Sequence, residues 1–341
     1  MSTSLKCPNC AASLVFDADA QQMTCSFCGS MINLADIVMD QSPEWKQEDW
    51  SQDAISYICG SCAATVVTDQ NTTATFCAFC GSPTIIPERL VAGYKPSYLI
   101  PFKYGKEEAI KAFFAWCRKG LMTPKDFVSQ SNIEKITGLY LPFWLYTIDV
   151  DVDFSAVGTM VHRHSTGSST TITTKYYNIV RRRDITWDKI PLDGATHVDD
   201  KLMEIVEPFQ YSEMIPFDMK YLAGFFAEKF DQEAKDLEPR LKERVSRYAR
   251  QIFESTCKQY SSVKDVSDEC VYAEPKAAYA LMPIWMLNYN YKGKKYTFAM
   301  NGQTGKIAGN PPVSRAKIAI VASSVAVVGG LIASFMGGLL S

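Results

Sequence analysis

The stretch from Leu141 to Phe154 carries the clearest alternation of apolar and polar positions in this chain. An apolar phrase, Leu141-Pro142-Phe143-Trp144-Leu145, leads into a run in which every second residue is apolar. The apolar positions are Ile148, Val150, Val152 and Phe154, and the polar positions between them are Asp149, Asp151 and Asp153. A period of two residues is typical of a strand with one buried face. The sequence therefore predicts a half-buried strand with three aspartates on its solvated face.

Other stretches have a helical period. Between Lys106 and Lys119 the apolar residues recur three and four positions apart, at Ala109, Ile110, Phe113, Phe114 and Cys117. This spacing places them on one face of a helix. A second, charged helix is predicted from about Arg240 to Lys258. Strands are predicted around Asn288–Tyr291 and Lys295–Met300, and the turn signal Asn301-Gly302 follows them.

The two sets of elements resemble each other in order. Ile100-Pro101-Phe102 precedes the first helix and Ile215-Pro216-Phe217 precedes the second. Leu141-Pro142-Phe143-Trp144 in the first half corresponds to Met282-Pro283-Ile284-Trp285 in the second. The predicted fold of residues 91–314 is therefore an α+β domain of two related halves, each a helix followed by antiparallel strands.

The C-terminal residues Ile318–Leu340 form a run of 23 residues with no charge and no proline. As a helix this run would be about 34 Å long, enough to cross roughly 30 Å of bilayer hydrocarbon. Arg315 and Lys317 precede it, and the positive-inside rule places that end in the cytoplasm. We expect a tail-anchored, single-pass protein of the cytoplasmic (plasma) membrane, with its N-terminus and bulk in the cytosol. The alternative is a buried C-terminal helix.

Small residues recur within this run. Every fourth position is small from Ala322 through Ala326, Gly330 and Ser334 to Gly338, and a parallel row holds Gly329, Ala333 and Gly337. Such spacing lets two membrane helices approach closely. The pattern fits a homo- or hetero-oligomer formed through the transmembrane helix, and it fits equally well a plain anchor rich in small residues.

Eight cysteines occur in two identical arrangements. Each arrangement holds two CxxC knuckles with 14 residues between them, and the second begins 52 residues after the first. The predicted ligands are Cys7, Cys10, Cys25 and Cys28 in the first site and Cys59, Cys62, Cys77 and Cys80 in the second. Two facing knuckles complete a tetrahedron around Zn²⁺. The sequence predicts two structural zinc ions per chain, each in a zinc ribbon.

Disulfides are the competing use of these cysteines, and the start of the sequence disfavours them. Met1 to Lys6 runs straight into the first knuckle without a signal peptide, and cytosolic thiols stay reduced. The remaining cysteines, Cys117, Cys257 and Cys270, have no partner spacing and are expected to be buried apolar residues. Four cysteine ligands close the zinc coordination sphere, and the three histidines (His162, His164, His197) lie far from the ribbons in the sequence. A structural rather than catalytic zinc follows.

Charge bears on what the ribbons bind. Residues 1–90 hold three basic residues against ten acidic ones, a formal charge of −7. Nucleic-acid binding depends on basic residues that displace counterions from phosphate, so this segment would repel a duplex. Phe27, Phe79, Trp45 and Trp50 could instead anchor a protein partner, although packing within the ribbons explains the two phenylalanines more simply.

Other candidate sites in the sequence have plain explanations. The aspartates from Asp149 to Asp153 could bind calcium, but a flat strand face does not wrap an ion. The one basic run, Arg181-Arg182-Arg183, could contact anionic lipid and is more simply a solvated strand end. His162-Arg163-His164 marks a hairpin end. Gly302-Gln303-Thr304-Gly305-Lys306 does not match a phosphate-binding loop, and no hydrolase or metalloprotease motif is present. We therefore expect no enzyme.

The CxxC pairs, the Ile-Pro-Phe and Leu-Pro-Phe-Trp phrases and the terminal anchor together make the chain resemble a known family. These are the bacterial membrane-anchored TFIIB-type zinc-ribbon proteins, and the resemblance covers nearly the full length. It implies a role in recruiting partners at the membrane under envelope stress, with PspA-like and SPFH-domain proteins as the partners.

The predicted organisation has five parts. Residues 1–38 form zinc ribbon 1, 39–55 an acidic linker, 56–90 zinc ribbon 2, 91–314 the α+β domain, and 317–340 the transmembrane helix. The predicted function is a non-enzymatic adaptor that recruits or scaffolds proteins at the cytoplasmic membrane. The alternative is a membrane-tethered nucleic-acid-binding regulator, for which residues 91–317 supply 32 Lys and Arg against 27 Asp and Glu.

Overall fold

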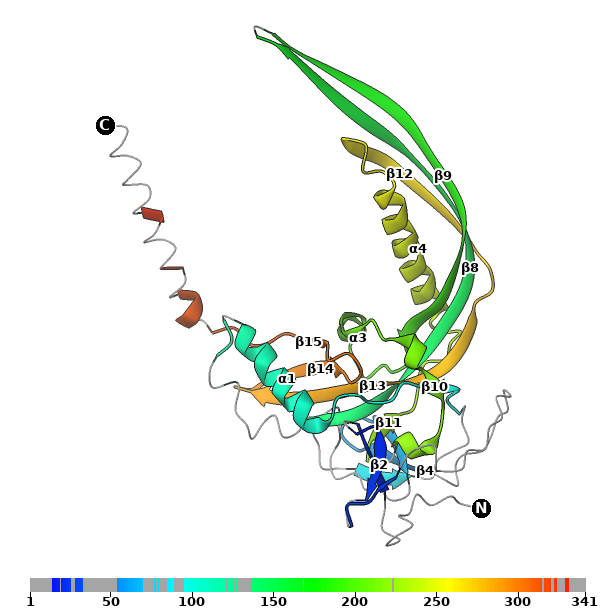
Figure 1. Cartoon of the computed structure of the whole chain (residues 1–341), viewed down its shortest axis with the longest axis vertical. Helices are drawn as coiled ribbons and strands as arrows, with labels where there is room; N and C mark the ends of the chain where they lie inside the picture. The colour runs from blue at the N-terminus through cyan, green and yellow to red at the C-terminus, as the bar shows by residue number, and fades with distance from the viewer. Residues whose placement is uncertain are drawn as a thin grey trace.

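The fold was analysed in a computed structural model of the full chain (Figure 1). The structure describes residues 14–18, 20–25, 28–32, 54–69, 77, 79, 85–88, 95–120, 122–124, 127, 136–167, 169–222, 224–314, 316–319, 322–323 and 329–330. Several predictions fall outside these residues: the ligands Cys7, Cys10 and Cys80, the aromatic residues Phe27, Trp45 and Trp50, residues 39–53 of the linker, and most of Ile318–Leu340. Among the described residues, no helix is long and apolar enough to cross a membrane.

The described elements fall into three groups along the chain. The strands before the first helix are β1 (Leu14–Asp17), β2 (Gln22–Cys25), β3 (Met31–Ile32), β4 (Ala54–Cys59), β5 (Thr65–Asp69), β6 (Ile85–Glu88) and β7 (Tyr98–Leu99). The middle of the chain forms α1 (Lys106–Lys119), β8 (Thr137–Thr166), β9 (Ser169–Asp193), α3 (Asp200–Val206), η3 (Tyr211–Glu213), β10 (Ile215–Pro216), η4 (Met219–Leu222) and β11 (Phe226–Glu228). The remainder forms α4 (Glu238–Ser255), β12 (Ser262–Tyr272), β13 (Lys276–Tyr291), β14 (Lys294–Asn301) and β15 (Ile307–Gly309).

One mixed sheet organises the molecule, in the order β10-β7-β13-β8-β11-β5-β4-β6. Its central strand is β8, whose first ten residues, Thr137–Tyr146, are buried because both faces of the sheet are covered there. The helix predicted at Lys106–Lys119 is confirmed as α1, which packs Phe113 edge-on against Phe298 of β14 at 5.1 Å between ring centroids. The second predicted helix is confirmed as α4, with a start two residues and an end three residues earlier than expected.

The two halves of the domain meet at an approximate two-fold axis. β8 and β13 pair antiparallel with Leu141 opposite Met282, the two residues that begin the repeated phrases. Equivalent positions of the phrases are therefore related by an axis that passes between these two residues. Backbone contacts follow the same relation. Gly194 donates to the carbonyl of Pro142 over 2.9 Å, and Gly302 donates to that of Pro283 over 2.8 Å.

The tryptophans of the two phrases have matching partners. Trp144 donates its indole N–H to the carbonyl of Gln232, and Trp285 donates to that of Tyr104, both over 2.9 Å. Phe230 lies 5.1 Å from the ring of Trp144, and Phe102 lies 5.2 Å from that of Trp285, with the same interplanar angle of 63°. The segment Phe102–Tyr104 is therefore equivalent to Phe230–Gln232.

The predicted match between Ile100-Pro101-Phe102 and Ile215-Pro216-Phe217 is wrong. β10 is the antiparallel outer neighbour of β7. The strand that mirrors β7 is β11, because β7 runs parallel to β13 as β11 runs parallel to β8. The equivalent of Ile100-Pro101-Phe102 is thus Glu228-Lys229-Phe230. Both segments have phenylalanine at the third position, where it contacts Trp285 in one half and Trp144 in the other. The residues at the first two positions differ in chemical type.

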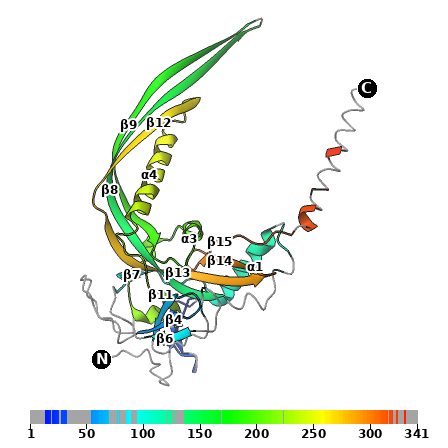
Figure 2. The ribbon, with the colours of Figure 1, turned by 180° about the vertical axis from the view of Figure 1, so that it is seen from behind.

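Beyond the body, β8 and β9 continue as a long, curved antiparallel hairpin (Figures 1 and 2). β12 pairs with β8 from Val150 to Thr159, and α4 covers the concave face, where Phe253 stacks on Phe154 at 4.6 Å. The predicted half-buried strand is confirmed, since Ile148 to Phe154 are buried at every second position and the aspartates lie on the opposite face. His162-Arg163-His164 lies next to the hairpin turn as expected, whereas Arg181-Arg182-Arg183 lies within β9 rather than at its end.

Candidate metal centre

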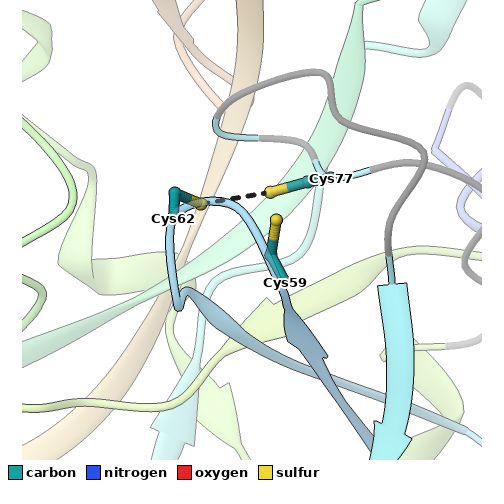
Figure 3. A group of neighbouring side chains, drawn as sticks. All are labelled: Cys59, Cys62 and Cys77. Carbon is teal, nitrogen blue, oxygen red and sulfur yellow. Dashed lines mark hydrogen bonds between the residues drawn. The ribbon is translucent and has the colours of Figure 1, made fainter.

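Three cysteines of the second predicted ribbon, called ribbon 2 below, converge on one point (Figure 3). The Sγ atoms of Cys59, Cys62 and Cys77 all lie within 4.8 Å of one another, and those of Cys62 and Cys77 are 3.7 Å apart. A tetrahedral Zn²⁺ with bonds of about 2.3 Å places its sulfur ligands about 3.8 Å apart. The spacing therefore fits zinc, and it exceeds the length of a disulfide bond, about 2.05 Å.

The knuckle that carries Cys59 and Cys62 is held by two backbone hydrogen bonds. Ala63 donates its N–H to the carbonyl of Cys59 over 2.8 Å, and Cys59 donates to the carbonyl of Ala64 over 3.0 Å. Ala63 adopts the left-handed conformation, with φ of 58°. The turn requires this conformation because it folds the chain back so that the two thiols face the same side.

The second knuckle of the first predicted ribbon, called ribbon 1, makes the same turn with Gly29 at the left-handed position. Gly29 donates to the carbonyl of Cys25, and Cys25 donates to that of Ser30, both over 2.9 Å. Gly29 has φ of 72°, and no atom lies within 4 Å of where its Cβ would be. Cys25 is buried at the end of β2, and the Sγ of Cys28 lies 3.0 Å from the hydroxyl of Ser30. The same knuckle geometry thus appears in both cysteine arrangements.

Because Gly29 occupies the same left-handed position as Ala63, we predict that Ala63→Gly increases the zinc affinity of ribbon 2. A Cβ in the left-handed region costs roughly 1–2 kcal/mol, and glycine removes this cost. Part of the resulting stabilisation is offset by the greater conformational freedom of glycine in the unfolded chain. We expect a net stabilisation of about 1 kcal/mol, or about fivefold tighter zinc retention in competition with a chromogenic chelator. Gly29→Ala is the matched control and should weaken ribbon 1 by a similar amount. An unchanged or weaker site in Ala63→Gly would contradict the backbone argument.

Five of the eight predicted ligands are therefore placed by the structure: Cys25, Cys28, Cys59, Cys62 and Cys77. Cys117 and Cys257 are buried as predicted, whereas Cys270 is only partly buried. Burial raises the pKa of Cys117 to about 12, which keeps it a neutral thiol. Phe79 is 5% exposed within the apolar core, so it is not an anchor for a partner.

The described parts of both cysteine-bearing segments contact the α+β domain. β5 of ribbon 2 pairs antiparallel with β11, which makes the ribbon a continuation of the central sheet. Lys295 of β14 donates to the carbonyl of Phe79 over 2.9 Å. Ribbon 1 rests on η4, where Phe16 meets Tyr221 edge-on at 5.2 Å, and Gln21 donates to the carbonyl of Phe102 over 2.5 Å.

A histidine that the sequence places far from the ribbons also reaches ribbon 2. The Nε2 of His197 lies 3.1 Å from the carbonyl oxygen of Cys62, and its Nδ1 lies 3.4 Å from Asp231 and 3.5 Å from Glu228. The expectation that all three histidines lie away from the ribbons is wrong for His197. The chain folds the β9–α3 connection against the knuckle, a long-range contact that leaves no local signal in the sequence.

Glu228 is the buried member of this cluster. It is 2% exposed, and its Oε2 has no hydrogen-bond partner among the described residues. Burial raises the pKa of Glu228 well above its usual range, and the nearby carboxylates of Asp231 and Asp193 raise it further. This carboxyl lies at the seam between ribbon 2 and the domain, next to the pairing of β11 with Val66.

Glu228→Gln is expected to stabilise the protein at high pH. The pKa of Glu228 is higher in the folded chain than in the unfolded one. The contribution of Glu228 to the free energy of unfolding is therefore fully present below the unfolded pKa and is lost as the pH rises through the folded pKa. An amide has no such loss, so we expect Glu228→Gln to be more stable than wild type at pH 8 and this difference to disappear as the pH falls to the unfolded value of 4.5. Urea unfolding of both chains at each pH measures the difference.

Glu213→Gln is the matched control for this experiment. Hydrogen bonds from Lys103 and Gln303 lower the pKa of Glu213, so the amide should lower stability at pH 8 rather than raise it. A gain in Glu228→Gln that does not depend on pH would contradict the assignment of a raised pKa.

Comparison with known proteins agrees with this geometry. Residues 5–48 match the protein family described as TFIIB zinc-binding. The chain is 38% identical over 345 residues to the uncharacterized protein YdjG of Bacillus subtilis strain 168, and the alignment covers 99% of each chain. No solved structure matches the chain. The chain therefore belongs to the family of bacterial proteins that includes YdjG and carries a TFIIB-type zinc ribbon at its N-terminus.

Proposed function

We propose that the chain is a non-enzymatic adaptor, anchored in the cytoplasmic membrane, that recruits or scaffolds partner proteins. The observation that carries this proposal is the attachment of both cysteine-bearing segments to the α+β domain. β5 joins ribbon 2 to the central sheet, and Phe16 and Gln21 hold ribbon 1 against the same body. Residues 1–90 carry a formal charge of −7, which suits docking of a protein better than binding of a polyanion.

The proposal includes two zinc ions per chain. Cys7, Cys10, Cys25 and Cys28 would hold one ion, and Cys59, Cys62, Cys77 and Cys80 the other. The described sulfurs of ribbon 2 and the similar backbone turn after Cys25 in ribbon 1 support this ligand set. The role of the metal is structural, because a ribbon of about 30 residues has too small a core to fold alone.

The membrane part of the proposal is based on the sequence of Ile318–Leu340, with Arg315 and Lys317 on its cytoplasmic side. Family resemblance supplies the partners, PspA-like and SPFH-domain proteins, and the setting of envelope stress. Carbonate extraction of cell membranes tests the anchor directly: the full chain should remain in the pellet, and a chain released into the supernatant would contradict it.

Partner recruitment is tested by co-purifying the full chain from detergent-solubilised membranes with its PspA-like and SPFH-domain neighbours. Met31 lies on ribbon 1 and is 64% exposed, so Met31→Lys should reduce recovery of a ribbon-bound partner severalfold. Ile205→Lys on α3, where the residue is 51% exposed, is the matched control and should leave recovery unchanged. Recovery of nucleic acid without protein would overturn the adaptor proposal.

The second candidate is a membrane-tethered nucleic-acid-binding regulator. Its supporting observation is that the far part of the β8–β9 hairpin carries basic residues and no acidic ones. DNA binding by the full chain that weakens steeply with salt would support this candidate over the adaptor.

A further inference from the structure

The far end of the β8–β9 hairpin is built unlike the rest of the sheet. We call residues 155–183 the distal arm. The third strand, β12, begins at Ser262, opposite Thr159, so among the described residues β8 and β9 pair only with each other between Thr159 and the hairpin turn (Figure 2). A two-stranded ribbon without a third strand or a packed face is marginally stable in water. Residues 160–175, the two-stranded part of the arm, would therefore be stabilised most by a surface that covers one of its faces, whereas residues 176–183 belong to the three-stranded part of the sheet.

The charge of the distal arm has a single sign. From Ser155 to Arg183 the sequence has no Asp or Glu. Its basic residues are Arg163, Lys175, Arg181, Arg182 and Arg183, together with His162 and His164. Arg182 stands opposite Asp153 in the hairpin, and its Nε lies 2.6 Å from the Oδ2 of that aspartate. The other four Lys and Arg side chains make no ion pair with any acidic residue in the described part of the chain.

The register of the hairpin sorts these residues onto two faces. Val161, Ile172, Tyr176 and Val180 belong to one face and are 40%, 56%, 73% and 53% exposed. Lys175, Arg181 and Arg183 belong to the other face, because they stand opposite Met160, Phe154 and Val152. Arg163 and Arg182 belong to the apolar face, because they stand opposite Ile172 and Asp153. One face of the distal arm thus carries the exposed apolar side chains together with these two arginines, and the other face carries the remaining three Lys and Arg residues.

We propose that the distal arm lies on the surface of an anionic lipid bilayer. Its apolar face would enter the boundary between headgroups and acyl chains, and its long Lys and Arg side chains would reach the lipid phosphates from above. This contact deepens the proposed function, because it rests on the placement of the chain at a membrane. It adds to the C-terminal anchor a second contact that senses lipid charge.

Lipid fits this surface better than a nucleic acid does. A duplex would neutralise the basic face but would leave Ile172 and Val180 in water, since phosphate and sugar offer no apolar phase. A bilayer satisfies both faces at once. Tyr176, the most exposed aromatic residue of the arm, is also of the type enriched at membrane interfaces.

Hydrogen–deuterium exchange of the full chain in lipid nanodiscs tests the proposal. One disc contains phosphatidylcholine alone, and the other contains phosphatidylcholine mixed with phosphatidylglycerol. Backbone N–H groups of the distal arm should exchange at least severalfold more slowly in the anionic disc, and high salt should remove the protection. Exchange in α1, which is far from the arm, should be the same in both discs.

A charge variant and a matched control separate the arm from general electrostatics. Lys175→Gln, Arg181→Gln and Arg183→Gln together remove three charges, each worth about a fivefold change in the docking constant. Lys201→Gln, Lys235→Gln and Lys276→Gln remove the same charge from exposed positions on the body. The arm variant should lose its protection in anionic discs, and the body variant should keep it.

The outcomes are distinct from those of the proposed function. If the chain is retained in both discs but the arm exchanges equally in both, the lipid contact is overturned and the anchor stands. If the arm is protected by duplex DNA and not by anionic lipid, the contact is also overturned, in favour of the nucleic-acid candidate. If the chain does not enter either disc, the anchor itself is overturned. Anionic vesicles added to that unanchored full chain then test the arm separately: arm protection supports the lipid contact, and its absence overturns it.

Discussion

Cys62→Ser is expected to abolish zinc binding at ribbon 2 and to destabilise the whole domain. Binding of structural zinc contributes about 10–16 kcal/mol in small zinc-finger peptides, and serine is a far poorer ligand than thiolate. We expect the zinc content of the full chain to fall by one ion and urea unfolding to begin at a lower concentration. Elemental analysis and circular dichroism measure these two effects.

The effect should reach beyond the ribbon because ribbon 2 shares its core with the domain. Ala64, Val66 and Phe79 belong to the same apolar cluster as Leu139 and Met282 on the central strands. Without its metal, ribbon 2 would release β5 from β11 and expose this face of the sheet. Cys270→Ser is the control, since Cys270 lies on β12 outside the ribbons and should change neither measurement. Unchanged zinc content in Cys62→Ser would contradict the ligand assignment.

Features set by neighbouring residues could be predicted from the sequence. The knuckles, α1 and the half-buried part of β8 each depend on a spacing within about 20 residues, and the structure places all three where the sequence indicates. The zinc ribbon at the N-terminus belongs to the same class, because its ligand spacing is itself the signal.

Features set by distant pairings could not be predicted. The partner of β5 is β11, more than 150 residues later, and β11 is three residues long with a buried glutamate at its end. The sequence Phe226-Ala227-Glu228 does not resemble Tyr98-Leu99-Ile100, the segment to which the two-fold axis relates it. In the structure, however, β11 runs parallel to β8 as β7 runs parallel to β13. The position of His197 against Cys62 has the same origin. Strand pairing specifies backbone direction and register but few side chains, so such symmetry can persist while the sequence diverges.

The second large effect is expected from Arg244→Met on α4. Arg244 is 4% exposed, and it donates to the carbonyl of Pro191 over 2.6 Å, to the hydroxyl of Tyr248 over 2.7 Å and to the carboxylate of Glu207. Burial alone would lower the pKa of Arg244, and the bond to Glu207 more than reverses that effect. Removing one partner leaves Glu207 buried without a counter-charge, which costs about 3–5 kcal/mol. Thermal and urea unfolding measure the loss.

Two companion variants identify the cause of that loss. Arg247→Met, three residues along the same helix, breaks an exposed pair with Glu204 and should cost about 0.5 kcal/mol or less. Combining Arg244→Met with Glu207→Leu should restore most of the stability, because a buried pair replaced by apolar side chains is often neutral. Acid should also narrow the gap between Arg244→Met and wild type, since burial raises the pKa of Glu207 and its protonation removes the unpaired charge. A loss that persists in the double variant would assign the effect to packing of α4 against β9 rather than to the ion pair.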